Sequence, residues 1–400
     1  MRPAINLKKI TQAARDLAVS SERQRNAFLT ALTDEIARAQ KKILAANVRD
    51  VREAKATRTA HSFVVRLELD DRGITQLTKK VDSIRRLKSG IGEVLEHSTL
   101  ENGLILKKVR VPLGVLLVIY EARPEVTIDA AGLCLKSGNA AILKGGSQAL
   151  RTNRALFDCV RSALRVSGLP EYAISFISSS DRSVTRNLLK RSDSIDLVIA
   201  RGGYEMVKAV MAQSRIPVLA HAAGGARVFV DRSADLTLAE KILLNAKTSK
   251  PAACNSLDTI LVHRDIAEKF VPQITAALTS HNVAVKKTLD WDRETLGPVV
   301  GIKIVKDADD AIRFIQKHTK LHTEGIIARD ATVIEWFLRS LDAAALFVNA
   351  STRLHDGYVF GLGSEMGIST SKLHARGPVG LKELTTYRWH IYGTGQIRKE

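Results

Sequence analysis

The sequence predicts an α/β protein of at least two domains, with a doubly wound parallel sheet in the first. Its 400 residues, 45% of them hydrophobic, exceed the roughly 250 to 300 residues at which a single core stops growing. Residues 126–199 alternate between helical periodicity and short apolar runs, which is typical of a parallel sheet covered by helices on both faces. A second stretch of the same kind begins near Arg227 and predicts a second α/β domain.

The amino-terminal part has helical periodicity from Ile5 to about Ala46. Ser21 and Gln24 have the spacing of a capping box ahead of an apolar stripe. Charged sequence that we also expect to be helical continues to about Leu95. Helices therefore open the fold.

Strand character begins near residue 104. Apolar residues among lysines predict a half-exposed strand over 104–111, and the uninterrupted apolar run at 115–119 predicts a buried one. The domain boundary is expected near Gly224 and Gly225. The remaining expected elements are helices at 126–136, 147–166 and 184–189, and strands at 140–143, 173–177, 197–199, 228–230, 259–262, 299–305 and 343–348.

Composition limits the class of protein. The longest apolar run, Val115 to Tyr120, is far short of the ~20 residues of a membrane span, and the amino terminus lacks a secretory signal. The three cysteines have no CxxC spacing, which argues against a disulfide framework or a metal site and favours a reducing cytoplasm. The net charge of +19 is dispersed along the chain, so small anionic ligands are favoured over nucleic acid.

Two glycine-bearing turns each follow an expected strand and precede an expected helix. They are Lys144, Gly145, Gly146 and Ser147, and Arg201, Gly202 and Gly203. Such turns can bind phosphate through backbone amides and a helix amino terminus, although turn geometry alone often requires glycine. Lys144 could pair with a ribose 2′-phosphate and favour NADP; the alternative is a solvated lysine.

Cys254 lies in a polar, proline-containing stretch between an expected helix and an expected strand. Lys247 and Lys250 precede it and could lower the pKa of its thiol, as a nucleophile requires. A bystander cysteine is the alternative from local sequence. His221, His322 and His374 each neighbour polar motifs, but none is assigned as a base.

Five stretches then carry a resemblance over essentially the whole length. They are residues 111–147, 196–203, 245–255 (NAKTSKPAACN), 348–389 and 395–398. In this order they resemble the gamma-glutamyl phosphate reductases, a family of the aldehyde dehydrogenase superfamily.

The resemblance implies an aldehyde dehydrogenase-like fold with three parts. Residues 1–225 would form the NADPH-binding domain, 226–365 the catalytic domain with Cys254, and 366–400 a segment that returns to the cofactor region. Strands near 104–111 and 387–397 would build a small β oligomerisation element.

The resemblance also implies the chemistry. Cys254 would be the nucleophile that forms a thioester with gamma-glutamyl phosphate, and NADPH would reduce that thioester to glutamate 5-semialdehyde in proline biosynthesis. The Lys144 and Arg201 turns would contact the cofactor, and Glu294 resembles a glutamate that holds its nicotinamide ribose. The phosphate and the carboxylate of the substrate would be bound by four residues of the recognised stretches: Arg123, Asn255, Arg353 and Arg376. The guanidinium group of arginine can bind either anion through two parallel hydrogen bonds.

Three features depart from the patterns of relatives. Glu125 stands where an asparagine oxyanion donor is common, Ala226 and Arg227 replace a Cys-His pair, and Ala220 replaces the glutamate base of oxidising aldehyde dehydrogenases. Two other functions therefore stay open: an oxidising semialdehyde dehydrogenase, and a catalytically weakened relative that acts as a basic binding protein. A homo-oligomer is expected, and association with a separate glutamate 5-kinase is a hypothesis.

Overall fold

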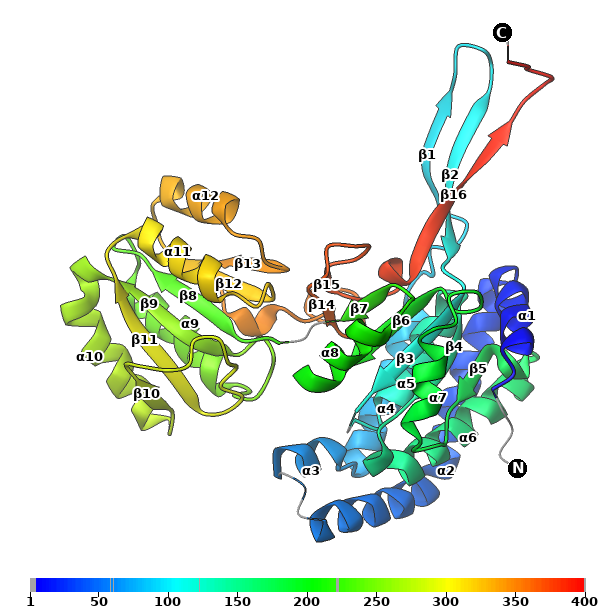
Figure 1. Ribbon diagram of the computed structural model, residues 1–400, viewed down its shortest axis with the longest axis horizontal. Helices are drawn as coiled ribbons and strands as arrows, with labels where there is room; N and C mark the ends of the chain where they lie inside the picture. Colours follow the sequence, from blue (N-terminus) through cyan, green and yellow to red (C-terminus); the bar gives the residue numbers. More distant parts are fainter. Residues whose placement is uncertain (1–4, 58, 60, 122, 221–222, 399–400) are drawn as a thin grey trace.

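The computed structural model describes residues 5–57, 59, 61–121, 123–220 and 223–398. Two α/β lobes lie side by side, and a narrow β arm projects from one of them (Figure 1). The α/β class with parallel sheets predicted from the sequence is confirmed. No helix in the described part of the chain is both long and apolar enough to span a membrane.

The first lobe contains a five-stranded parallel sheet in the order β5-β4-β3-β6-β7. In chain order this is 3-2-1-4-5, the arrangement of dinucleotide-binding sheets, in which ligands bind where the order reverses, at the carboxyl ends of the strands. The strands are β3 (Val115–Tyr120), β4 (Ala140–Lys144), β5 (Ile174–Phe176), β6 (Leu197–Arg201) and β7 (Val218–Ala220).

Helices cover this sheet and confirm the helical amino terminus. The capping box at Ser21 is present, since its amide donates to Gln24 Oε1 at 2.9 Å and the amide of Gln24 donates back to Ser21 Oγ at 3.2 Å. The helices of this lobe are α1 (Leu7–Ala18), α2 (Glu22–Ala56), α3 (His61–Leu67), α4 (Asp71–Arg86), α5 (Val126–Lys136), α6 (Leu150–Ser167), α7 (Arg182–Leu188) and α8 (Tyr204–Gln213), with short 3₁₀ turns η1 (Ser147–Ala149) and η2 (Glu171–Ala173).

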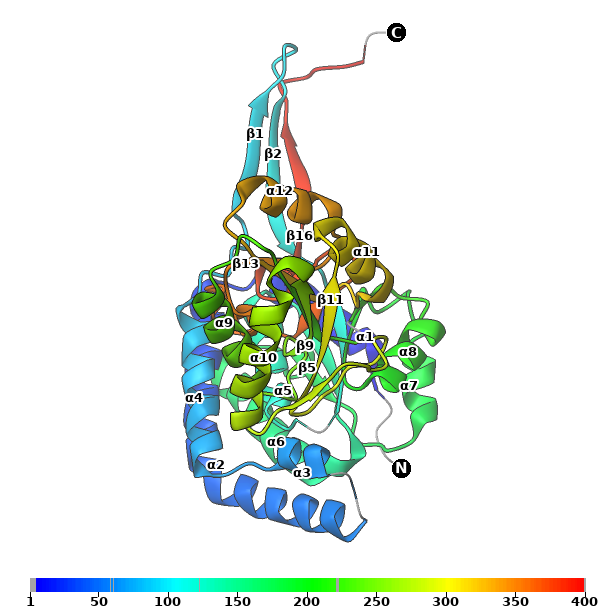
Figure 2. The ribbon, with the colours of Figure 1, turned by 90° about the vertical axis from the view of Figure 1, so that its left-hand side faces the viewer.

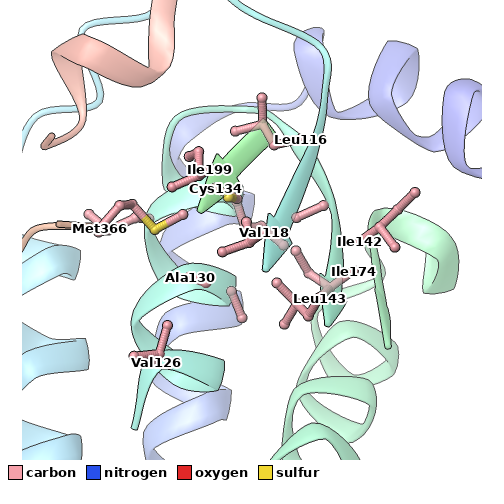
Figure 3. Packing of buried hydrophobic residues seen from close by; sticks show 14 of the residues in the cluster. Leu116, Val118, Val126, Ala130, Cys134, Ile142, Leu143, Ile174, Ile199 and Met366 are labelled. Atoms are coloured by element: carbon pink, nitrogen blue, oxygen red, sulfur yellow. The ribbon is translucent and has the colours of Figure 1, made fainter. Parts of the chain in front are cut away.

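The core of the first lobe explains its continuous apolar strand. All six residues of β3 are buried, because helices cover both faces of the sheet. Cys134 on α5 packs among Ile199, Met366 and neighbouring aliphatic side chains (Figure 3). Burial raises the pKa of the Cys134 thiol, so this cysteine is structural.

The second lobe contains a six-stranded sheet in the order β10-β11-β9-β8-β12-β13, parallel throughout. Two apolar clusters lie on its two faces. Its elements are β8 (Ala226–Val230), α9 (Leu236–Thr248), β9 (Leu257–His263), α10 (Arg264–Ser280), β10 (Ala284–Lys286), β11 (Val299–Val305), α11 (Ala308–His318), β12 (Thr323–Ile327), α12 (Ala331–Ser340) and β13 (Ala345–Val348), followed by η3 (Thr352–Leu354).

The arm is an antiparallel sheet of three strands, β1 (Val94–Thr99), β2 (Ile105–Pro112) and β16 (Thr385–Tyr392), with β2 in the centre. It stands away from both lobes (Figure 2). The expectation of helix up to Leu95 is wrong: α4 ends at Arg86, where Leu87 turns to an extended conformation. Gly90 and Gly92 follow with positive φ angles of 74° and 83°, which favour glycine and form the turn before β1.

The carboxyl-terminal segment returns to the first lobe. Met366 belongs to its core, and the amide of Thr370 donates to the carbonyl of Ala220 at 3.3 Å. The short pair β14 (Ile368–Ser369) and β15 (Gly377–Pro378) and the turn η4 (Lys382–Leu384) lead into β16. The pairing of β2 with β16 is therefore observed, whereas its role in an oligomer stays a prediction.

Candidate active site

Three neighbouring strands of the second sheet begin at one edge and bring the candidate catalytic groups together. In the order β9-β8-β12, Cys254 precedes β9, Gly224 and Gly225 precede β8, and His322 precedes β12. Because the strands are parallel, these three loops meet at the amino edge of the sheet.

The loop of Cys254 is held against the glycine loop. The amide of Gly225 donates to the carbonyl of Cys254 at 2.6 Å. A Cβ on Gly224 would lie 2.3 Å from the same carbonyl oxygen and 2.7 Å from Cys254 Cβ, so glycine is required there for the close approach of two backbones. The cysteine itself is half-buried.

His322 lies beside the Cys254 thiol and favours its ionised form. Burial opposes ionisation of the thiol, but the neighbouring imidazole outweighs it, so the pKa of Cys254 lies below its ordinary value. His322 was not assigned from the sequence. The one available signal was its polar surroundings, because the strand that follows it, β12, was not among the predicted strands. His221 lies outside the described residues.

The sequence attributed a lowered thiol pKa to Lys247 and Lys250, and the structure separates these two lysines. Lys247 is buried, donates to Thr295 Oγ1 at 2.9 Å and lies 3.6 Å from Asp258. Lys250 interacts electrostatically with Cys254, and burial together with Arg123 and Arg353 lowers its own pKa.

Cations from both lobes surround the thiol. Arg123 follows β3 of the first sheet, is half-buried, and interacts electrostatically with Cys254 and with Arg201. Burial lowers the pKa of Arg123 and of Arg353, and the latter also interacts with Cys254. Glu125 offsets part of this charge, because it acts on both Arg123 and Lys250.

Asn255 ties the nucleophile loop to η3. Its side-chain amide donates to the carbonyl of His355 at 2.9 Å, and its backbone carbonyl accepts from Thr352 Oγ1 at 2.8 Å. Its Oδ1 accepts from Arg353. The predicted substrate residues Asn255 and Arg353 thus touch each other beside Cys254, whereas Arg376 pairs with Asp342.

Two carboxylates also lie near the thiol. Glu294 accepts from the amide of Gly224 at 2.5 Å, and Glu365 accepts from the amide of Gly357 at 2.8 Å. The charges of both carboxylates oppose ionisation of Cys254. A thiolate at this position therefore needs the histidine and the cations.

Arg227 forms a buried ion pair with Glu324 on the neighbouring strand. Its Nη1 lies 3.1 Å from Glu324 Oε1, its amide donates to Oε2 at 3.0 Å, and its Nη2 donates to the carbonyl of Trp291 at 3.3 Å. Arg227 therefore joins β8 to β12 beneath the site.

The two predicted phosphate turns lie at the carboxyl edge of the first sheet, on the strands that flank β3. Gly145 is closely packed, because a Cβ there would lie 2.2 Å from Asn153 Nδ2. Lys144 donates to the carbonyl of Gly145 at 2.8 Å, burial lowers its pKa, and the exposed Ser147 starts η1.

In the second turn, the backbone amide at the start of α8 donates a hydrogen bond to a carboxylate. The amide of Gly203 donates to Glu121 Oε2 at 2.7 Å, which is an anion at a helix amino terminus. Arg201 Nη1 donates to the carbonyl of Met366 at 3.4 Å. Ala220, at the end of β7, lines a small cavity with Arg201 and Met366; among the described residues no carboxylate lines it.

Comparison with known proteins identifies this arrangement. The aldehyde dehydrogenase family model matches residues 5–291. A protein of Caldanaerobacter subterraneus named gamma-glutamyl phosphate reductase is 42% identical, with all of both chains covered, and so is a protein of that name from Carboxydothermus hydrogenoformans. The chain belongs to the gamma-glutamyl phosphate reductases of the aldehyde dehydrogenase family.

Solved structures of the family agree. The gamma-glutamyl phosphate reductase of Thermotoga maritima superposes with a TM-score of 0.95 at 38% identity, covering 98% of this chain and 99% of that one. An engineered glycolyl-CoA reductase with bound NADP⁺ has a TM-score of 0.70 at 16% identity, over 96% and 95% of the two chains. At that identity the likeness concerns the fold alone.

Proposed function

We propose that this protein reduces gamma-glutamyl phosphate to glutamate 5-semialdehyde and phosphate, with NADPH as reductant, in proline biosynthesis. The observation that carries the proposal is the Cys254 thiol, which lies beside His322 and interacts electrostatically with Arg123, Lys250 and Arg353, in a chain that matches reductases of this name over its full length. A cytoplasmic location is expected for such an enzyme.

Cys254 has the properties of a nucleophile. Its pKa lies below the ordinary value, and the thiolate is the reactive form of cysteine. Attack on the acyl carbon forms a thioester and expels phosphate. The backbone amide of Cys254 is the proposed donor to the oxyanion that develops during attack.

The surrounding cations suit an anionic substrate. Arg123 and Arg353 each lower the pKa of Lys250, which means that the three cations repel one another. An acyl phosphate brought among them relieves this repulsion, and guanidinium groups can bind its phosphate or its carboxylate through two parallel hydrogen bonds. Asn255 would fix the orientation of Arg353, while Arg376 reaches the substrate only if it leaves Asp342.

The carboxyl edge of the first sheet fits a dinucleotide. Gly145 leaves no room for a side chain, Asn153 Nδ2 beside it has no hydrogen-bond partner among the described groups, and the amide of Gly203 already donates to the carboxylate of Glu121. These two turns and Lys144 would hold the phosphates of NADPH, and Glu294 its nicotinamide ribose. A bound nicotinamide supplies the hydride that reduces the thioester.

Ala220 suits a reductase. Oxidising members of the superfamily need a base to activate water against the thioester, and an alanine cannot serve as one. The thioester of this chain would therefore survive long enough to be reduced.

The arm supports a homo-oligomer. Its outer strands β1 and β16 are edges of the sheet, and β16 exposes Tyr387, Trp389 and Ile391. Exposed edges with aromatic side chains favour pairing with a second chain. Association with a glutamate 5-kinase, which would deliver the unstable acyl phosphate directly, is proposed on chemical grounds alone.

The test is the reverse reaction, NADP reduction by glutamate 5-semialdehyde with and without phosphate. The wild type should require phosphate, and Cys254→Ala should lose all measurable turnover. Cys159→Ala is the matched control, because Cys159 is buried and burial raises its pKa to about 12; it should keep near-normal activity. Phosphate-independent activity would instead indicate an oxidising dehydrogenase.

A further inference from the structure

We propose that His322 is the proton acceptor and donor of Cys254, and that Thr323 and His355 hold its imidazole in the orientation this requires. The aldehyde dehydrogenase resemblance assigned no histidine to this role. The proposal rests on the proposed function for the reaction that it serves, but the pairing of thiol and imidazole is a property of the protein alone.

The placement of these side chains carries the inference. The amino edge of the second sheet brings His322, immediately before β12, beside Cys254, shortly before β9. The Nδ1 of His322 lies 2.7 Å from Thr323 Oγ1, and the same hydroxyl lies 2.8 Å from His355 Nδ1. The two imidazole rings meet edge to face at 5.2 Å. These contacts continue through the His355 carbonyl to Asn255, next to the nucleophile. His322, Thr323 and His355 are all fully buried.

The single proton of the Thr323 hydroxyl couples the two imidazoles. The hydroxyl can donate to only one of the two imidazoles and must accept from the other. If Thr323 donates to His355, the Nδ1–H of His322 donates to Thr323, and Nε2 is the nitrogen that exchanges a proton with the thiol. This arrangement persists when His322 is protonated, so the ring need not turn during catalysis.

The other charged groups around the thiol cannot do this work. Glu294 and Glu365 oppose its ionisation, the guanidinium groups of Arg123 and Arg353 keep their protons, and Lys250 acts on Cys254 through its charge. Imidazole titrates near neutral pH. Among the groups described around the thiol, His322 is therefore the proton carrier.

The proton balance follows. His322 takes the proton from Sγ as the thiolate forms the C–S bond and the acyl C–O bond breaks, and the imidazolium gives this proton to the departing phosphate. After hydride addition to the thioester carbon, the oxyanion re-forms C=O as the C–S bond breaks. Solvent then reprotonates the thiolate through His322, which accounts for the one proton consumed.

The experiment is the pH dependence of iodoacetamide alkylation at Cys254, followed by peptide mass spectrometry in the full-length protein. His322→Gln should move the midpoint upwards, towards the free-thiol value of about 8.5, and lower the phosphate-dependent kcat/KM by about 10²- to 10⁴-fold. Thr323→Val keeps the shape of the buried side chain and should produce a smaller upward shift, with kcat/KM reduced by about tenfold.

Two outcomes would overturn the proposal. One is an unchanged alkylation midpoint in folded His322→Gln, whatever happens to turnover. The other is a Thr323→Val variant with normal turnover at every pH. Because alkylation needs neither substrate nor cofactor, a shifted midpoint in a protein without reductase activity would support the thiol–imidazole pair and sink only the proposed function.

Discussion

The first sheet turns the carboxyl ends of its strands towards the site, whereas the second sheet turns the amino ends of its strands. At a carboxyl end the chain enters a helix, whose amino terminus carries partial positive charge and attracts anions. At an amino end the chain has just left a helix: α9 ends at Thr248 before Cys254, and α11 ends at His318 before His322.

This difference determines at which edge side chains must supply the positive charge that stabilises an anion. At the first edge, backbone amides already favour an anion, as the contact between Gly203 and Glu121 illustrates. At the second edge, helix carboxyl termini disfavour a thiolate. His322, Lys250 and the arginines supply the positive charge that the backbone does not.

The largest expected effect comes from adding one methyl group at each edge and comparing the two variants. Gly224→Ala should lower turnover of the reverse reaction by at least about 10²-fold, because the added Cβ displaces the Cys254 loop and a shift of about 1 Å is enough for such a loss. Gly203→Ala is the counterpart at the first edge. Its Cβ would meet Glu121 at an ordinary 3.6 Å, so kcat measured at saturating NADP should stay near normal. Equal activity of the two variants would contradict the comparison.

The buried ion pair beneath the amino edge should dominate its stability. Arg227→Met leaves Glu324 buried without its partner and should cost about 3 kcal/mol in urea unfolding. Arg329→Met, which breaks an exposed pair with Asp235, should cost less than about 1 kcal/mol.

The pH dependence of the Arg227→Met loss can be derived. Burial raises the pKa of Glu324 above its ordinary value even with Arg227 present. Protonation of Glu324 therefore stabilises the folded state, and this stabilisation is lost as the pH rises through the raised pKa. The loss caused by Arg227→Met should therefore be larger at pH 8 than at pH 5. A constant loss would show that Glu324 stays neutral.

At the carboxyl edge, Lys144→Met should raise the KM for NADPH by about tenfold through loss of one charged contact with the 2′-phosphate, and change the KM for NADH little. Initial rates with the two cofactors measure this. Lys287→Met, at an exposed position of the second lobe, should change neither. Equal losses with both cofactors would place the 2′-phosphate elsewhere.

The smallest effect on the reaction is expected from Glu125, which lies where the two edges meet. Glu125→Gln removes a negative charge that acts on Arg123 and Lys250 and should lower the KM for phosphate in the reverse reaction by about threefold, as for a partly exposed ion pair. Glu171→Gln, exposed in η2, is the control. A higher KM would mean that Glu125 itself contacts the substrate.

Periodicity sufficed for most elements, because the core-facing pattern of a strand or helix is local. The strands at 115–119 and 299–305 lie where the sequence predicted them. β1 was missed since its six residues are all exposed, and an exposed strand carries no burial pattern to detect.

The site was only partly predictable for a different reason. Cys254 could be singled out by its polar surroundings, but His322 lies 68 positions further along the chain and reaches the thiol through the order β9-β8-β12. Strand order depends on packing between distant segments, which periodicity does not encode. The same holds for Arg376, which lies in a recognised stretch yet pairs with Asp342.

The pairing of β2 with β16 has a consequence for biosynthesis of the chain. Ile105 aligns with Tyr392 and Pro112 with Thr385, so the arm cannot be completed until the ribosome has released nearly the entire polypeptide. The sheets of both lobes contain shorter loops and can fold earlier, since closing a long loop is entropically costly. A nascent chain stalled before residue 385 would expose one edge of β2, and the surface that a second subunit would use would be assembled last.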